Sequence, residues 1–292
     1  ITAYKDPTQL ANLINDLADP DCHFYVNIDK KSELANKGAI EQIKSLPNVK
    51  VYCRYNIRWG GFSHFRALVD MTRQAYANPE IAYFHTLSGQ DKPIVGLSAF
   101  FDFFERNNGK EFISYMKLPS LSWENGGLDR IGLYHLNDIL DCRKQRNQRI
   151  NKALLRLQKK IGIHRSILRY YGEFYGGGTW WSLSRTAISE IIATIESRKS
   201  LIPSLHFSFC AEEIFFQTVI MNSHMSSNVE NNDLRYVDWS SKYGSCPAVL
   251  DETDFGNIIN SGKLFARKID STISRTLVLK LEQHLAESLA TR

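Results

Sequence analysis

Short apolar runs alternate with segments of helical periodicity over the first third of the chain. Three runs have the length and composition of buried strands: residues 23–28, 49–53 and 81–87. Amphipathic spacing predicts helices before, between and after them: residues 7–18, 32–45, 63–77 and 98–105. Parallel strands need a long crossover, usually a helix. This order therefore predicts an α/β fold with a Rossmann-like, mainly parallel central sheet flanked by helices.

The remaining two thirds are less regular but contain the same two kinds of element. Strands are predicted over residues 111–117, 179–183 and 234–238. Helices are predicted over residues 185–198, 211–222, 252–260 and 276–290. No internal repeat or low-complexity linker interrupts the chain, so we expect one compact domain over 1–292. Ligands of such sheets usually gather at the carboxyl ends of the strands.

The formal charge of +5 is concentrated in one segment. Residues 143–165 contain nine basic side chains and no acid, and without them 27 basic and 31 acidic residues remain, a charge of −4. This distribution argues against a generally basic nucleic-acid-binding protein. Ile150, Leu154, Leu157 and Ile161 are spaced four, three and four residues apart. The segment is therefore predicted to form a basic amphipathic helix.

Several function classes lack their motifs in this chain. The five cysteines show no CxxC spacing, and no cluster of histidines and carboxylates has metal-ligand spacing. The glycine run 176–178 does not match a dinucleotide-binding GxGxxG, and no P-loop is present. No apolar run is long enough to span a bilayer, and no leader peptide is visible. We expect a protein of a reducing compartment, without a zinc site or a dense disulfide framework.

Carboxylates at two kinds of position are candidates for function. Asp29 and Asp91 follow predicted strands, where a carboxylate can accept a hydrogen bond from a ribose or sugar hydroxyl. Equally, each can cap a helix or close a turn. Glu212 and Glu213 open a predicted helix, and by position alone they complement the positive end of its dipole.

Seven blocks of the chain resemble one family of glycosyltransferases. This family contains the core-2/I-branching β-1,6-N-acetylglucosaminyltransferases and the peptide O-xylosyltransferases. The blocks occur in the family's order at residues 23–32, 59–63, 87–94, 178–185, 211–219, 232–239 and 264–270. One such block would be weak support, but seven in order make a chance similarity very improbable.

The resemblance implies a GT-A-like fold and an inverting mechanism with a UDP-sugar donor, usually UDP-GlcNAc or UDP-xylose. It also implies catalysis without a divalent metal, so the UDP-sugar is a substrate and no cofactor is expected. Residues 1–105 would form the nucleotide-sugar half, and 106–270 the half with the acceptor and the catalytic base. The basic helical insert, 143–165, and a C-terminal helix, 271–292, complete the expected organisation.

The resemblance assigns chemical roles to three residues: Glu213, Arg267 and Lys268. Glu213 matches the family's general base, which takes the proton of the acceptor hydroxyl, whereas Glu212 keeps the role of a helix-terminal charge. Arg267 and Lys268 match the basic pair that stabilises the leaving diphosphate. The alternative for that pair is a solvated surface position.

Further donor contacts follow from the same resemblance. Asp29 matches the position that contacts the uridine, and the backbone near Ile1 and Ala3 should lie beside the same base. Asp91 matches a position near the donor sugar and the diphosphate.

Aromatic residues and one carboxylate are candidates for the acceptor side. Trp180 and Trp181 can form an apolar wall for a pyranose, but paired tryptophans in a strand are more often core, and we expect one of them to be core. Trp59, beside two glycines, has the same two interpretations. Glu173 precedes the glycine run, where the family often places acceptor contacts.

Two other functions remain open beside the glycosyltransferase. A non-enzymatic scaffold could use residues 143–165 on anionic lipid or polysaccharide. Binding of RNA through the same segment is the least supported, because the remainder is acidic. The expected acceptor is a glycan or a lipid-linked glycan. We expect a soluble, bacterial-type member in the cytoplasm, with peripheral contact at the inner face of the membrane as a further expectation.

Overall fold

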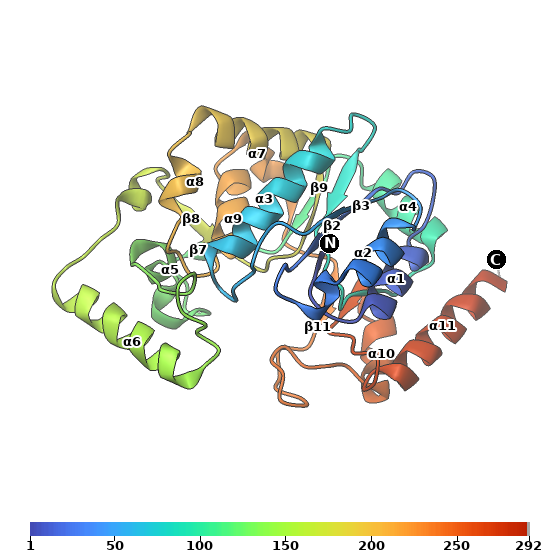
Figure 1. Cartoon of the computed structure of the whole chain (residues 1–292). Helices are drawn as coiled ribbons and strands as arrows, with labels where there is room; N and C mark the ends of the chain where they lie inside the picture. The colour runs from blue at the N-terminus through green and yellow to red at the C-terminus, as the bar shows by residue number, and fades with distance from the viewer. Residues whose placement is uncertain (291–292) are drawn as a thin grey trace. The chain divides into compact units, whose positions relative to one another are not determined.

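A computed structural model describes residues 1–290 and confirms an α/β fold (Figure 1). The chain forms two compact units that interleave in sequence. The first unit comprises Ile1–Arg54, His85–Gly109 and the chain from Asn232 onward; the second comprises Tyr55–Phe84 and Lys110–Asn231. These two units are defined by packing and not by function. The roles expected of residues 1–105 and 106–270 therefore stay predictions.

Parallel pairing organises the start of the first unit. Its first sheet has the order β1 (Thr2–Ala3), β2 (Phe24–Ile28), β3 (Val49–Tyr52), and both pairs are parallel. The connections contain α1 (Pro7–Asp16), and then η1 (Glu33–Ala35) with α2 (Lys37–Lys44). On its other side β1 contacts residues 87–89: the Thr2 amide donates to the Leu87 carbonyl at 2.9 Å, and the Gly89 amide donates to that of Thr2 at 3.0 Å. This is the strand–helix order predicted for residues 7–53.

A second sheet of the first unit joins distant parts of the sequence. β12 (Phe265–Arg267) pairs in parallel with β11 (Arg235–Val237) and antiparallel with β5 (Lys92–Pro93). The helical segments here are α4 (Leu97–Arg106), η5 (Glu252–Asp254), α10 (Phe255–Ile259) and α11 (Arg275–Ala290). Apolar side chains of α10, α11 and β12 share one buried cluster. The expected C-terminal helix, 271–292, begins at residue 275, and residues 291–292 lie outside the described part of the chain.

The second unit has its own sheet and core. The sheet order is β10 (Val229–Glu230), β6 (Glu111–Ile113), β9 (Trp181–Ser184), β4 (Tyr83–His85), and β7 (Met116–Leu118) pairs separately with β8 (Phe174–Gly176). The core helices α3 (Phe62–Tyr76), α7 (Arg185–Ser197) and α9 (Glu212–Met221) pack against one another (Figure 1). The shorter helical segments are η2 (Glu124–Gly126), α5 (Asp129–Gly132), η3 (Ser166–Arg169), α8 (Leu201–Ser204) and η4 (His224–Asn228).

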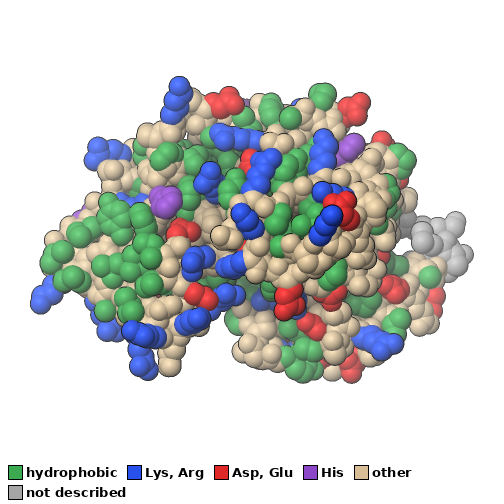
Figure 2. All heavy atoms as spheres, in the orientation of Figure 1, with side chains coloured by type: hydrophobic (Ala, Val, Ile, Leu, Met, Phe, Trp, Pro, Cys, Tyr) green, Lys and Arg blue, Asp and Glu red, His purple; other side chains and the backbone are tan. Residues whose placement is uncertain are grey.

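The basic segment predicted to be helical forms α6 (Gln145–Lys160) in the second unit. Figure 2 shows Lys and Arg side chains along the region where α6 lies in Figure 1, beside a gathering of hydrophobic side chains.

The strands differ from the prediction in two respects. Among residues 1–290 they divide into four small sheets, and antiparallel pairs occur beside the parallel ones. The single strand predicted over 111–117 is two strands, β6 and β7, because β6 pairs with β9 whereas β7 pairs with β8. The interruption falls at Ser114, whose hydroxyl accepts a hydrogen bond from the Gly178 amide at 3.2 Å.

We predict that Gly177→Ala destabilises the second unit by about 1–3 kcal/mol, because the added methyl group overpacks the backbone. A Cβ atom at Gly177 would lie 2.0 Å from the Ser114 carbonyl oxygen, which cannot move as a side chain can. Urea unfolding measures the loss. The matched control is Gly172→Ala, since a Cβ there meets nothing within 4 Å. Equal stability of the two variants would contradict this close approach.

Candidate active site

Glu213 lies in the first turn of α9 and pairs with Arg130 of α5. The Glu213 Oε2 atom is 2.6 Å from the Arg130 Nη1 atom, and the carboxylate side chain is 27 % exposed. The guanidinium carbon of Arg130 lies 3.6 Å from the centre of the Trp123 ring, so a cation–π contact holds the cation that orients the carboxylate. A partly exposed carboxylate in a set position is suited to exchanging a proton with a bound molecule.

The surroundings raise the pKa of Glu213. Burial is the largest cause, because it disfavours the charged carboxylate, and the neighbouring charge of Glu212 acts in the same direction. Arg130 and His64 lower the pKa without reversing the shift. Glu213 is therefore a stronger base than an exposed glutamate, as a general base near neutral pH requires.

Glu212 has a separate role from its neighbour. Its side chain is buried, and its Oε1 atom lies 2.8 Å from Nδ1 of His64 on α3. Beyond the expected charge at a helix start, Glu212 therefore links α9 to α3. The adjacent carboxylates have different partners, which leaves Glu213 as the more accessible one.

The glycine run 176–178 sets the position of the start of α9. The Gly177 amide donates to the Glu213 carbonyl at 2.9 Å, and the Gln217 side-chain amide donates to the Gly178 carbonyl at 2.7 Å. A Cβ at Gly176 would lie 2.5 Å from the Trp123 ring, which also forms the cation–π contact with Arg130. Small residues at these positions bring the β8–β9 connection against the helix that holds Glu213.

The three candidate tryptophans differ in exposure. Trp181 is 2 % exposed and packs against Phe216 with a centroid distance of 5.2 Å, so it is the core residue expected of the pair. Trp180 is 8 % exposed, and its role as a sugar wall stays a prediction. Trp59 is 55 % exposed and stands edge-on to Phe209 at 5.4 Å, which presents an open indole to solvent in the second unit.

Glu173 lies at the start of the β8 region, in an exposed position. It pairs with Lys117, and the Tyr175 hydroxyl donates to its carboxylate at 2.6 Å. These two hydrogen bonds lower the pKa of Glu173. Both partners of the Glu173 carboxylate belong to the β7–β8 pair itself and do not indicate an acceptor. The acceptor contact therefore stays a prediction.

The first unit holds the residues expected to contact the donor. Arg267 on β12 forms an ion pair with Asp91, with 3.1 Å between Nε and Oδ1, and both residues are buried. The Ser88 amide donates to the other carboxylate oxygen of Asp91. Burial lowers the pKa of the Arg267 guanidinium, while Asp91 opposes this change. Arg267 is thus not the solvated surface residue of the alternative interpretation.

Further cations lie around Arg267. Burial lowers the pKa of Arg235, on the adjacent strand β11, to about 10. Arg235 donates to the Thr86 carbonyl at 2.8 Å. The ammonium of half-buried Lys268 donates to the Ser245 hydroxyl at 3.1 Å, and burial followed by the charge of Arg267 lowers its pKa. Within the described chain Lys268 forms no ion pair. Its position therefore favours a bound anion.

Asp29 lies at the carboxyl end of β2, as predicted. Its amide donates to the Ala3 carbonyl at 2.9 Å, and the Asn27 amide donates to the Ile1 carbonyl at 2.8 Å, so residues 1–3 do lie beside this strand end. The Asp29 carboxylate accepts from the Lys31 amide at 3.2 Å, which is the turn expected as an alternative. The other carboxylate oxygen lies 3.9 Å from Nζ of Lys31, and neither contact decides the donor role.

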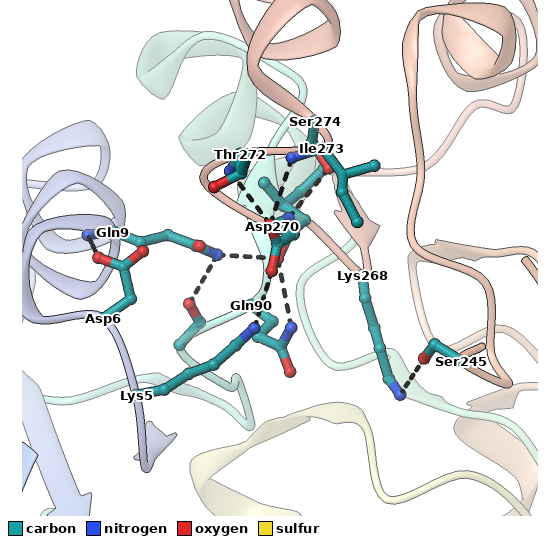
Figure 3. A network of polar contacts seen from close by, with 12 residues as sticks. Lys5, Asp6, Gln9, Gln90, Ser245, Lys268, Asp270, Thr272, Ile273 and Ser274 are labelled. Atoms are coloured by element: carbon teal, nitrogen blue, oxygen red, sulfur yellow. Dashed lines mark hydrogen bonds and ion pairs between the residues drawn. The ribbon is translucent and has the colours of Figure 1, made fainter. Parts of the chain in front are cut away.

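A polar network lies beside Lys268 (Figure 3). Lys5 pairs with Asp270 at 2.9 Å, and the Gln9 side chain donates to the carbonyls of Gly89 and Ile269, each at 3.0 Å. Lys268 points away from Asp270 toward Ser245 (Figure 3). The network ties Lys5 and Gln9 to the chain after β12, so it holds the residues that follow Lys268.

Sequence reasoning missed three residues that support these sites: Arg130, Arg235 and His64. Arg235 lies inside the block 232–239 that resembles the family, so the sequence marked its position. Nothing in the sequence indicated that its side chain is buried. Arg130 and His64 had no local signal, because each acts through a partner distant in sequence. No group of three or more His, Cys, Asp or Glu residues within residues 1–290 is arranged to hold a metal ion. Metal independence nonetheless stays a prediction.

Comparison with known proteins supports the resemblance seen in the sequence. The model of the Core-2/I-branching enzyme family matches residues 1–258. Xylosyltransferase 2 of Homo sapiens is 26 % identical over 95 % of this chain, and Xylosyltransferase oxt of Drosophila pseudoobscura pseudoobscura is 22 % identical over 95 %. The aligned region covers 32 % of each relative, so the chain spans about a third of their length.

We predict a stability change with pH that reports on Glu213. Folding raises its pKa above the ordinary 4.5, so the folded state binds this proton more tightly than the unfolded chain. The unfolding free energy therefore falls as pH rises from about 4.5 through the folded pKa. Glu213→Gln removes this titration. In urea unfolding at a series of pH values, the variant should gain stability relative to wild type over that window and run parallel above it.

Glu173→Gln serves as a control of opposite sign. The pKa of Glu173 is lowered on folding, so its stabilising contribution is present above its unfolded pKa and lost as pH falls through the folded pKa. That variant should lose stability relative to wild type as pH rises. The same slope in both variants would contradict the environment described for Glu213.

Proposed function

Because the chain belongs to the Core-2/I-branching enzyme family, we propose that it is an inverting glycosyltransferase. It moves a sugar from a UDP-sugar to a hydroxyl group of a glycan or of a lipid-linked glycan. The observation that carries the proposal is Glu213, a partly exposed carboxylate of raised pKa held by Arg130 at a helix start.

The proposed step uses Glu213 as the general base. As the acceptor oxygen bonds to the anomeric carbon, its proton passes to the Glu213 carboxylate. The bond from that carbon to the diphosphate breaks on the opposite face, and its electron pair leaves with UDP. The raised pKa favours this transfer, because it brings the proton affinity of the base nearer to neutral pH. Arg130 positions the carboxylate but does not touch the reacting atoms in this scheme.

The leaving diphosphate requires positive charge, which we assign to Arg267 and Lys268. Arg235 adds a third cation to the same unit. Cations in a site that excludes water stabilise a developing phosphate charge more strongly than exposed ones. We therefore propose that these residues replace a divalent metal. Asp29 and the backbone of Ile1 and Ala3 are assigned to the uridine.

Xylose and N-acetylglucosamine are the proposed donor sugars. The curated relatives support xylose by their names, and the family name supports a branching sugar transfer. Trp59 and Trp180 are the proposed apolar walls for a sugar ring, and Glu173 is proposed as an acceptor contact. Exposure favours Trp59 for a direct contact.

We predict that Glu213→Gln lowers the rate of sugar transfer by about 10²–10⁴-fold, because the amide cannot accept the proton. UDP affinity should remain unchanged, since Glu213 is not assigned to the donor. Release of UDP from UDP-xylose or UDP-GlcNAc with a glycan acceptor measures the rate. Glu196→Gln, an exposed position on α7, is the matched control and should keep wild-type activity. Full activity of Glu213→Gln would show that another group is the base.

We predict that Lys268→Ala weakens UDP binding about tenfold or more, since a hydrogen bond between charged groups is lost. Lys280→Ala on α11 is the control, because that lysine is exposed. Calorimetric titration with UDP measures both. A chelator should change neither the UDP affinity nor the transfer rate. Loss of either in EDTA, with recovery on adding Mg²⁺ or Mn²⁺, would contradict the metal-independent assignment.

A further inference from the structure

Helix α6 turns its polar side chains toward the protein. The two buried residues of this helix are Asn151 and Gln158. Asn151 accepts a hydrogen bond from the Leu136 amide at 2.9 Å. Gln158 accepts from the Tyr134 amide at 2.8 Å and donates to the carbonyl of the same residue at 2.9 Å. Hydrogen bonds between these side-chain amides and the backbone of residues 134–136 therefore attach the helix to the rest of the second unit.

Ile150 and Leu157 of α6, and Ile161 at its end, face solvent instead, whereas Leu154 and Leu155 are half-buried. Ile150 is 44 % exposed, Leu157 is 52 % exposed and Ile161, at the helix end, is 61 % exposed. Their spacing of seven and four residues places them on one stripe of the helix surface. Figure 2 shows hydrophobic side chains gathered in the region of α6. A helix of a soluble protein normally buries such a stripe, so this one is arranged to bury it against something else.

Basic side chains flank this stripe. Of the nine cations in residues 143–165, eight are exposed. The ninth, Arg165, is buried and donates to the Leu133 carbonyl at 3.1 Å. Among the exposed ones, Arg146, Arg149 and Lys160 lie within α6 on the side of the apolar stripe away from the buried amides. The rest of the sequence has a formal charge of −4, so positive charge is concentrated on this one surface.

We propose that α6 docks on an anionic membrane surface, with the stripe Ile150, Leu157 and Ile161 inserted at the boundary between headgroups and acyl chains. A bilayer surface offers an apolar layer beneath a layer of negative charge, which matches a stripe flanked by cations. A nucleic acid would engage the cations and leave the stripe exposed. Within the described residues no helix is long and apolar enough to cross a membrane, so this contact is interfacial. The proposal does not depend on the sugar-transfer chemistry.

Sedimentation of the full chain with lipid vesicles tests the proposal. Wild type should bind vesicles of phosphatidylcholine mixed with phosphatidylglycerol, bind phosphatidylcholine alone much more weakly, and be released by added salt. The double variant Leu157→Gln/Ile161→Gln keeps every charge and should lose about tenfold or more of its vesicle affinity. Leu279→Gln is the matched control, because that leucine is equally exposed, on α11, and its binding should equal that of wild type.

A second variant separates the contribution of charge. Arg146→Gln/Arg149→Gln should weaken binding to the anionic vesicles and make the remainder less sensitive to salt. Circular dichroism and thermal unfolding check that both double variants fold, as expected for exposed positions. Three results would overturn the proposal: no binding to anionic vesicles, unchanged binding by Leu157→Gln/Ile161→Gln, or self-association of wild type in solution that this variant abolishes.

Discussion

Pairing along a very short strand is the constraint on which the first unit depends. β1 has only two residues, yet it pairs with β2 on one side and contacts residues 87–89 on the other. Buried backbone groups must be hydrogen-bonded, so neither neighbour can shift without losing partners. Asp29 follows the first neighbour directly, and Asp91 lies two residues after the second. The return of β12 to β5 then places Arg267 against Asp91.

Charge inside the protein is distributed unequally between the two candidate sites. Arg267, Arg235 and Lys268 place positive charge in the first unit, which favours an anion there. In the second unit Glu213 pairs with Arg130, and burial still leaves its pKa raised. In the proposed function each arrangement serves one half of the group transfer: the first would stabilise the leaving anion, and the second would receive the proton.

Periodicity predicted the helices well because their apolar faces recur locally, as in α1, α3 and α7. Strands were harder to predict. Residues 111–117 read as one apolar run, and their division at Ser114 follows from pairing with two different partners far along the chain. Resemblance singled out Glu213 and Arg267, but it supplied neither Arg130 nor the burial of Arg235, because those depend on contacts with distant residues.

Helix α6 separates what the sequence alone determined from what the tertiary structure decided. Composition and spacing determined a basic helix with one apolar stripe, since both properties are local. They did not determine which face is buried. That was decided by the backbone amides near residues 134–136, whose hydrogen bonds are completed by Asn151 and Gln158 and leave the stripe exposed. A sequence pattern describes the faces of an element, whereas only the surrounding chain decides which face it covers.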